Sequence, residues 1–176
     1  MLSIKPRTLS RILAAAAVIC LIMAGSASNA AAEKFYKIGG IFSVTGPASF
    51  LGDPEKKSME MAVEQINQNG GIDGHMLEAV IYDTEGDPSK AVMSVSKLIN
   101  KDRVIAIVGP SRTPTTLAVV PMIERAQLPL ISCAAGNKIV EPVKPWIFKT
   151  AQSDIQAVAT IYDHMEKKGY EKISII

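Results

Sequence analysis

Short apolar runs alternate with longer amphipathic stretches along most of the chain. Six of the apolar runs have the length of β-strands: Lys37–Phe42, Met76–Tyr82, Val104–Val108, Leu128–Ile131, Trp146–Lys149 and Lys172–Ile176. The third run is β-branched and apolar on both faces, which is typical of a central strand in a parallel sheet. Between the runs, apolar residues recur at helical spacing. This alternation predicts an α/β fold built on a doubly wound parallel sheet.

Capping and breaking residues mark where the helices should begin and end. Asp53-Pro54 and Asp87-Pro88 each join an N-cap residue to a proline at the first helical position. Gly70-Gly71 should end the first of these helices. Ser153 caps the last predicted helix, which should end near Gly169.

The first 32 residues have the pattern of an export signal. Basic residues precede an apolar run, Ile12–Ala24, and small residues follow it. The run is shorter than the roughly 20 residues that span a bilayer. We expect a signal peptidase to cut after Ala30 or Ala32. An uncleaved anchor and lipid attachment at Cys20 are the alternatives, and the bulky Ile19 disfavours the second.

Removal of this segment changes the charge of the protein. The whole chain has 19 basic and 17 acidic residues and a net charge of +2. Three of the basic residues and none of the acidic ones lie in the signal, so the mature chain has a net charge of −1. Nothing in that balance favours a nucleic-acid partner. Cys133 is the single cysteine that remains, so the core must form without an internal disulfide.

Three loops should meet at one edge of the sheet: Ser43–Asp53, Gly109–Pro114 and Ser132–Asn137. Each follows a predicted strand, and open parallel sheets bind ligands outside the carboxyl ends of their strands. The loops are rich in small residues, which leave backbone groups accessible. Two of them lead directly into helices, whose N-termini attract anions. A small ligand with a carboxylate fits this geometry without any catalytic group.

Motifs for catalysis, metal binding or cofactor binding are weak. Gly109–Pro114 lacks the Gly-Lys-Ser/Thr ending of a phosphate loop. Gly39-Gly40 lies inside a strand, whereas a dinucleotide fingerprint follows one. The acidic segment Asp83–Asp87 lacks the spacing of a calcium loop and is expected to be a solvated turn. His75 and His164 are expected at the surface. We therefore predict binding, with no cofactor and no metal, and regard an enzyme as the minor alternative.

Several motifs follow one another in a set order: Ile41–Pro47, Phe50–Asp53, Asn67–Asp73, Tyr82-Asp83 with Asp87-Pro88, Val108–Pro110 and Ile131–Ala135. In this register they resemble the periplasmic branched-chain amino-acid-binding proteins, the type I solute receptors of ABC importers. The resemblance implies a Rossmann-like lobe and a chain truncated relative to the family. Residues 33–148 would form an incomplete N-terminal ligand-binding lobe. Residues 149–176 would form the crossover and the first helix and strand of a second lobe.

The resemblance assigns ligand contacts to five residues. Thr113 matches the hydroxyl residue that holds the carboxylate of the ligand, and Ala134 and Ala135 match two small residues that offer backbone groups. Leu51 stands where the family has an aromatic residue that packs on the ligand. Gly136 stands where a threonine hydroxyl usually binds the amino-acid head group.

Gly136 is the departure that bears most on the ligand. A hydrogen bond to a charged group is typically worth about 1.5–3 kcal/mol, and glycine cannot make it with a side chain. The expected ligand is therefore a small carboxylate-bearing molecule: a branched-chain or other amino acid, or a related organic or aromatic acid. The resemblance implies a monomeric periplasmic receptor that closes around its solute and delivers it to a membrane permease. A ligand-sensing domain of the same fold is the alternative.

Overall fold

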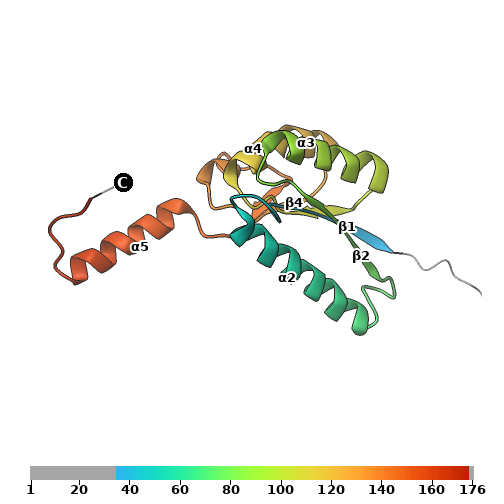
Figure 1. Cartoon of the computed structure of the whole chain (residues 1–176), viewed down its shortest axis with the longest axis horizontal. Coiled ribbons are helices and arrows are strands. Elements are labelled where there is room, and N and C mark those ends of the chain that lie inside the picture. Colours follow the sequence, from blue (N-terminus) through green and yellow to red (C-terminus); the bar gives the residue numbers. More distant parts are fainter. Residues whose placement is uncertain (1–34, 175–176) are drawn as a thin grey trace, which may run out of the picture. The chain divides into compact units, whose positions relative to one another are not determined.

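The computed structural model describes residues 35–174, so the predicted signal segment lies outside the described residues (Figure 1). The strands described are β1 (Tyr36–Phe42), β2 (Leu77–Asp83), β3 (Ala106–Val108), β4 (Leu130–Ser132) and β5 (Ile147–Lys149). They form one parallel sheet in the order β2-β1-β3-β4-β5. The predicted α/β class with a parallel sheet is confirmed.

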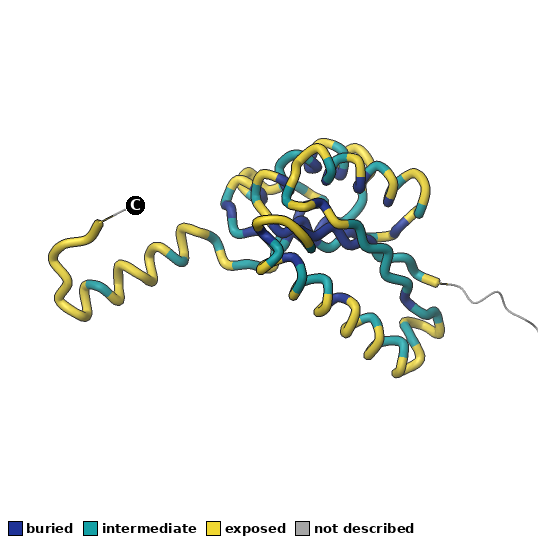
Figure 2. The backbone as a smooth tube through the Cα atoms, viewed as in Figure 1, coloured by how far each residue is buried: buried dark blue, intermediate teal, exposed yellow. Residues whose placement is uncertain are grey.

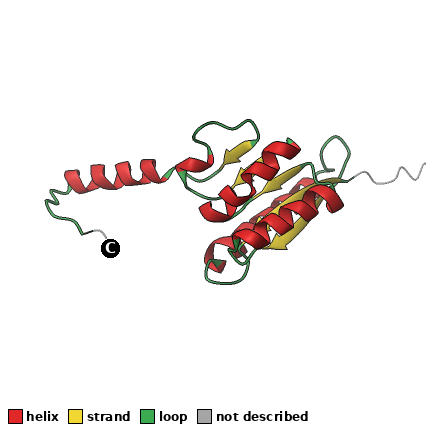
Figure 3. Ribbon diagram, turned by 90° about the horizontal axis from the view of Figure 1, so that it is seen from above, coloured by secondary structure: helices red, strands yellow, loops and turns green. Residues whose placement is uncertain are grey.

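Helices lie on both faces of this sheet. They are α2 (Ser49–Gln68), α3 (Pro88–Lys97) and α4 (Thr113–Ala126), with a π-helical turn η1 (Leu98–Asp102) and a 3₁₀ turn η2 (Asn137–Ile139). Helix α5 (Asp154–Lys167) instead extends away from the sheet (Figure 1). Figures 1 and 3 show α3 and α4 side by side on one face and α2 on the other. No described helix combines the length and the apolar character that crossing a membrane requires.

The winding of the chain reverses at β1. Ile38 of β1 pairs with Ala79 of β2 on one side and with Ala106 of β3 on the other. The loops that leave β1 and β3 therefore diverge towards opposite faces, which opens a crevice at the carboxyl ends of these strands. Such a switch point is where open α/β sheets bind ligands.

The apolar core is concentrated between the sheet and the α3–α4 layer (Figure 2). Ile41, Leu98, Ile107 and Ile123 are fully buried there. By contrast, α2 contributes only Gly52 and Met59 as buried residues. Packing therefore fixes the α3–α4 side of the sheet more firmly than the α2 side.

The start of α2 differs from the prediction. The helix begins at Ser49, so Pro54 lies inside it and the predicted loop Ser43–Asp53 is shorter. Gly52 explains the early start, because a Cβ on this residue would lie 2.3 Å from the backbone carbon and oxygen of Ser43. Close backbone packing, which only glycine permits, holds the extra turn against the end of β1.

Other predicted helix boundaries are confirmed. The Asp87 side chain accepts a hydrogen bond from the Lys90 N–H at 2.9 Å, and Pro88 occupies the first turn of α3. Ser153 and Gln156 form a reciprocal capping box at the start of α5.

The predicted final strand is wrong over the part that is described. Lys172–Ser174 has no strand conformation, and the last two residues lie outside the described ones. A strand pairs its N–H and C=O groups with a neighbouring strand, and the described part of the chain offers none here.

Candidate functional site

A pocket of about 440 Å³ lies at the carboxyl ends of β3 and β4. It is lined by residues from the start of α2, the start of α4 and the loops that follow β3, β4 and β5: Leu51, Ser111, Arg112, Thr113, Pro114, Cys133, Ala134, Ala135 and Ala151. Four of the five predicted ligand contacts are among them. The fifth, Gly136, contacts Thr113. The structure thus brings the predicted residues together, and their contact with a ligand remains a prediction.

The N-terminus of α4 forms one wall of the pocket. The helix begins at Thr113, and Pro114 in its first turn has no N–H. The Arg112 carbonyl accepts hydrogen bonds from the Thr116 N–H and from the hydroxyls of Thr115 and Thr116. The N–H groups of Thr113 and Thr115 have no partner among the described residues. Free N–H groups at a helix start carry partial positive charge and bind carboxylates well.

Thr113 and Gly136 fit each other closely. The Gly136 N–H donates to Thr113 Oγ1 at 3.2 Å. A Cβ on Gly136 would lie 2.5 Å from Thr113 Cγ2 and 2.7 Å from Oγ1. The threonine side chain therefore occupies the space that a larger residue at position 136 would need. Its hydroxyl accepts from Gly136 and keeps its own hydrogen for a further acceptor.

In the loop after β4, some backbone groups are bonded within the protein, and one donor and one acceptor are left without a partner among the described residues. The Ala134 N–H donates to Ser132 Oγ at 3.1 Å, and the Lys149 ammonium donates to the Ala135 carbonyl at 2.9 Å. The Ala134 carbonyl and the Ala135 N–H have no partner among the described residues. These two groups are available to a ligand in the pocket.

A polar network joins the switch point to α2. Ser111 Oγ accepts a hydrogen bond from the Ser43 N–H at 3.0 Å and donates one to the Glu55 carboxylate. Burial raises the pKa of Glu55, and the hydrogen bond from Ser111 opposes that rise. Nothing in the local sequence pattern pointed to Glu55, because its role depends on a residue 56 positions away.

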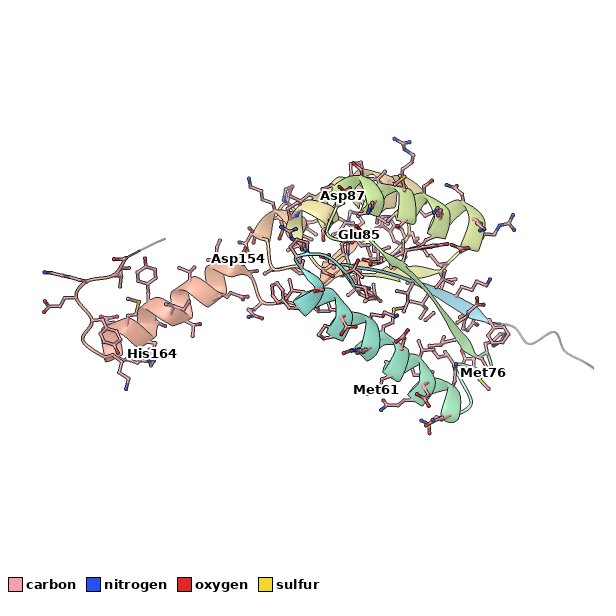
Figure 4. All side chains as sticks on the ribbon, in the orientation of Figure 1. Met61, Met76, Glu85, Asp87, Asp154 and His164 are labelled. Atoms are coloured by element: carbon pink, nitrogen blue, oxygen red, sulfur yellow. The ribbon has the colours of Figure 1, made fainter. Side chains whose placement is uncertain are left out.

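The acidic turn after β2 is more ordered than a solvated turn. The Asp83 carboxylate accepts hydrogen bonds from the Val44 N–H at 3.0 Å, from the Thr45 N–H and hydroxyl at 3.1 and 2.6 Å, and from the Glu85 N–H at 2.8 Å. Burial alone would raise the pKa of Asp83, but hydrogen bonds from Thr45, Glu85 and Val44 together outweigh it and lower the pKa. Figure 4 shows Glu85 and Asp87 near the start of α3. No metal-ligating cluster occurs among residues 35–174.

Cys133 is half-buried where the pocket meets the α2 side of the sheet. Burial, with a smaller contribution from the Glu55 charge, raises the pKa of its thiol to about 11. The thiol is therefore protonated at neutral pH and is a poor nucleophile. His164 is exposed on α5 (Figure 4), and His75 stacks on Tyr36 at a centroid distance of 4.8 Å.

Comparison with known proteins identifies the architecture. Residues 36–176 match the family model described as periplasmic binding protein. A leucine-, isoleucine-, valine-, threonine- and alanine-binding protein of Pseudomonas aeruginosa is 38% identical over 147 residues. That match covers 83% of this chain and 38% of the relative. The Leu/Ile/Val-binding protein of Escherichia coli is 32% identical over 108 residues, which cover 61% of this chain and 29% of the relative.

Solved structures agree with this result. A branched-chain amino acid transporter substrate-binding protein from Streptococcus pneumoniae, in complex with isoleucine, has a TM-score of 0.66 and 32% identity, covering 69% of this chain and 35% of its own. An ABC-transporter solute-binding protein from Rhodopseudomonas palustris, in complex with 3,4-dihydroxybenzoic acid, has a TM-score of 0.70 and 27% identity. The match covers 77% of this chain and 37% of the neighbour. The chain thus spans less than two fifths of the length of these relatives. It belongs to the periplasmic binding protein family.

Proposed function

We propose that this chain forms the ligand-binding lobe of a periplasmic solute receptor that serves an ABC importer. The observation that carries the proposal is that the N-terminus of α4 opens onto one pocket, which Thr113 lines with an N–H group and a hydroxyl. These donors suit a carboxylate and need no catalytic side chain. Relatives with this fold are receptors of the same transport class.

The ligand need not be an amino acid. Thr113 fills the space beside Gly136, so no hydroxyl can project from position 136 towards an ammonium group. No carboxylate side chain lines the pocket among the described residues. The structural neighbours were solved with isoleucine and with 3,4-dihydroxybenzoic acid, so closely similar folds hold both kinds of acid.

The site is completed by a second lobe in this proposal. Residues 33–148 form the first lobe, and residues 149–176 lead into the second. Small-molecule sites typically enclose about 70–90% of the ligand surface, which a wall on one side cannot do. The 176-residue chain alone should therefore bind weakly. Calorimetry that finds micromolar affinity for the isolated chain would contradict this part of the proposal.

A ligand screen tests the proposal. The protein is prepared as its genome encodes it, with any sequence that continues beyond Ile176, and its melting temperature is measured with leucine, alanine, benzoate and 3,4-dihydroxybenzoate. We expect one or more carboxylates to stabilise the protein, and Thr113→Val to weaken that ligand about tenfold or more. Thr160→Val, on the exposed face of α5, is the matched control. Stabilisation by none of these acids would count against the assignment.

Delivery to a permease requires a separate test. Deletion of the gene should abolish uptake of the stabilising ligand by intact cells, and complementation should restore it. Uptake that is unchanged while a ligand-dependent response is lost would favour the sensor alternative instead.

A further inference from the structure

Arg112 is the charged residue among those that line the pocket in the described chain. Its side chain is exposed and forms no ion pair with a described carboxylate. An unpaired guanidinium at the edge of a pocket is a ready partner for a carboxylate, because its planar N–H groups match the two oxygens. No recognised motif pointed to this residue.

The Arg112 side chain lies against the turn that follows β2. Its Nη1 atom lies 3.1 Å from where a Cβ on Gly86 would be, and its Cδ lies 3.5 Å away. Gly86 has φ +74, so the turn after β2 both requires glycine and leaves room for the guanidinium. The Cβ position on Gly86 is also 3.5 Å from Ser43 Oγ, which is fully buried and has no hydrogen-bond partner among residues 35–174. The guanidinium thus lies at the switch point, between the loops that follow β1, β2 and β3.

A second positive charge borders the pocket on the β5 side. Lys149 donates to the carbonyl of Ala135, which is itself a lining residue. The Glu55 carboxylate accepts a hydrogen bond from Ser111, a lining residue, and itself lines the groove between α2 and the sheet. Among the described residues that line the pocket, Arg112 therefore carries a positive charge and none carries a negative charge, while Lys149 and Glu55 each bond to a lining residue from outside it.

We propose that Arg112, supported by Lys149, determines ligand specificity by selecting small organic acids with a net negative charge over zwitterionic amino acids. This inference rests on the proposed receptor function. Positive charges a few ångströms from a ligand stabilise its carboxylate and repel its ammonium group. Arg112 acts on the charge of the ligand, whereas Thr113 and the α4 N–H groups position its carboxylate.

The test separates charge from shape. Wild type, Arg112→Gln and Arg112→Lys are compared by calorimetry with 3,4-dihydroxybenzoate and with leucine, at low and high salt. We expect wild type to prefer the acid, and Arg112→Gln to weaken the acid about tenfold or more while leaving leucine unchanged or improved. Arg112→Lys should restore most of the affinity. Arg125→Gln, in the last turn of α4, is the matched control and should bind as wild type does.

The outcomes distinguish this inference from the receptor function. If wild type binds leucine more tightly than the acid, or if Arg112→Gln binds the acid as wild type does, the inference is wrong and the receptor function stands. Equal losses for both ligands would assign Arg112 a structural role and also overturn the inference. If wild type binds no carboxylate probe, the proposed function fails and the inference falls with it.

Discussion

At the scale of single residues, the pair formed by Thr113 and Gly136 decides the shape of the pocket. The threonine methyl and hydroxyl occupy the volume beside the glycine, and the hydroxyl accepts the Gly136 N–H. Each residue therefore constrains the other. The effect of a substitution at position 136 therefore depends on the side chain at position 113.

Gly136→Ala should displace the Thr113 side chain and destabilise the protein by about 1–3 kcal/mol, the range typical of overpacking. Ligand affinity should fall as well, because the displaced hydroxyl no longer faces the carboxylate. Thermal denaturation and calorimetry measure the two effects. In the double variant Thr113→Ser/Gly136→Ala the methyl is gone, so part of the stability should return. If Gly136→Ala alone is as stable as wild type, the predicted overpacking at this site is wrong.

Asp83 should make stability depend on pH in the acidic range. Its pKa in the folded protein lies below the ordinary value of 3.8, so its contribution is present above that value and is lost as the pH falls through the lowered pKa. Melting temperatures between about pH 6 and pH 2 should therefore fall less steeply for Asp83→Asn, which should already be less stable at pH 6. Asp163→Asn, on exposed α5, should follow the wild-type curve. Parallel curves for Asp83→Asn and wild type would contradict the prediction.

At the scale of elements, α2 shows how a tertiary contact overrides a local start signal. Asp53-Pro54 is a good N-terminus in isolation, yet the helix begins at Ser49. The extra turn exists because Gly52 packs on the Ser43 backbone at the end of β1. That contact also places Leu51 at the pocket.

Gly52→Ala should destabilise the protein, although glycine to alanine inside a helix normally stabilises it by roughly 0.5–1 kcal/mol. The new methyl would overlap the Ser43 backbone, which cannot move without distorting β1. We expect a loss of about 1–3 kcal/mol in chemical denaturation. Ser58→Ala, at an exposed position of the same helix, should be neutral or slightly stabilising. A gain of stability for Gly52→Ala would refute the role assigned to this contact.

At the scale of the whole molecule, the two faces of the sheet differ. The α3–α4 face carries the core cluster, whereas a groove of about 470 Å³ remains between α2 and the sheet, lined by apolar residues such as Phe42, Met59 and Val108. Helix α5 has no buried residue, and its large apolar side chains Ile155, Val158, Ile161 and Tyr162 are exposed. Both surfaces have the character of regions that pack against further polypeptide.

Residues 33–176, prepared alone, should bind a hydrophobic dye strongly. Val158 and Ile161 are 48% and 57% exposed, so Val158→Asp/Ile161→Asp should lower both dye fluorescence and self-association. His164→Asp, on the same helix, is the matched control. Dye binding that does not respond to the double change would place the exposed apolar surface elsewhere.

The sequence by itself determined most of the elements and the location of the pocket. Strand periodicity, the Asp87 cap and the Ser153 capping box are local signals, and small residues after parallel strands indicate a ligand edge. The resemblance to the receptor family then assigned Thr113, Ala134 and Ala135 to that edge, where all three line the pocket. Only the tertiary structure decided where α2 begins, which side chain accompanies Gly136, and which groups Glu55, Asp83 and Arg112 meet. The physical reason is the separation along the chain of the residues that interact. Helix and strand patterns act over a few residues, whereas these contacts join strand ends far apart in the chain, and only packing of the sheet and helices brings them together.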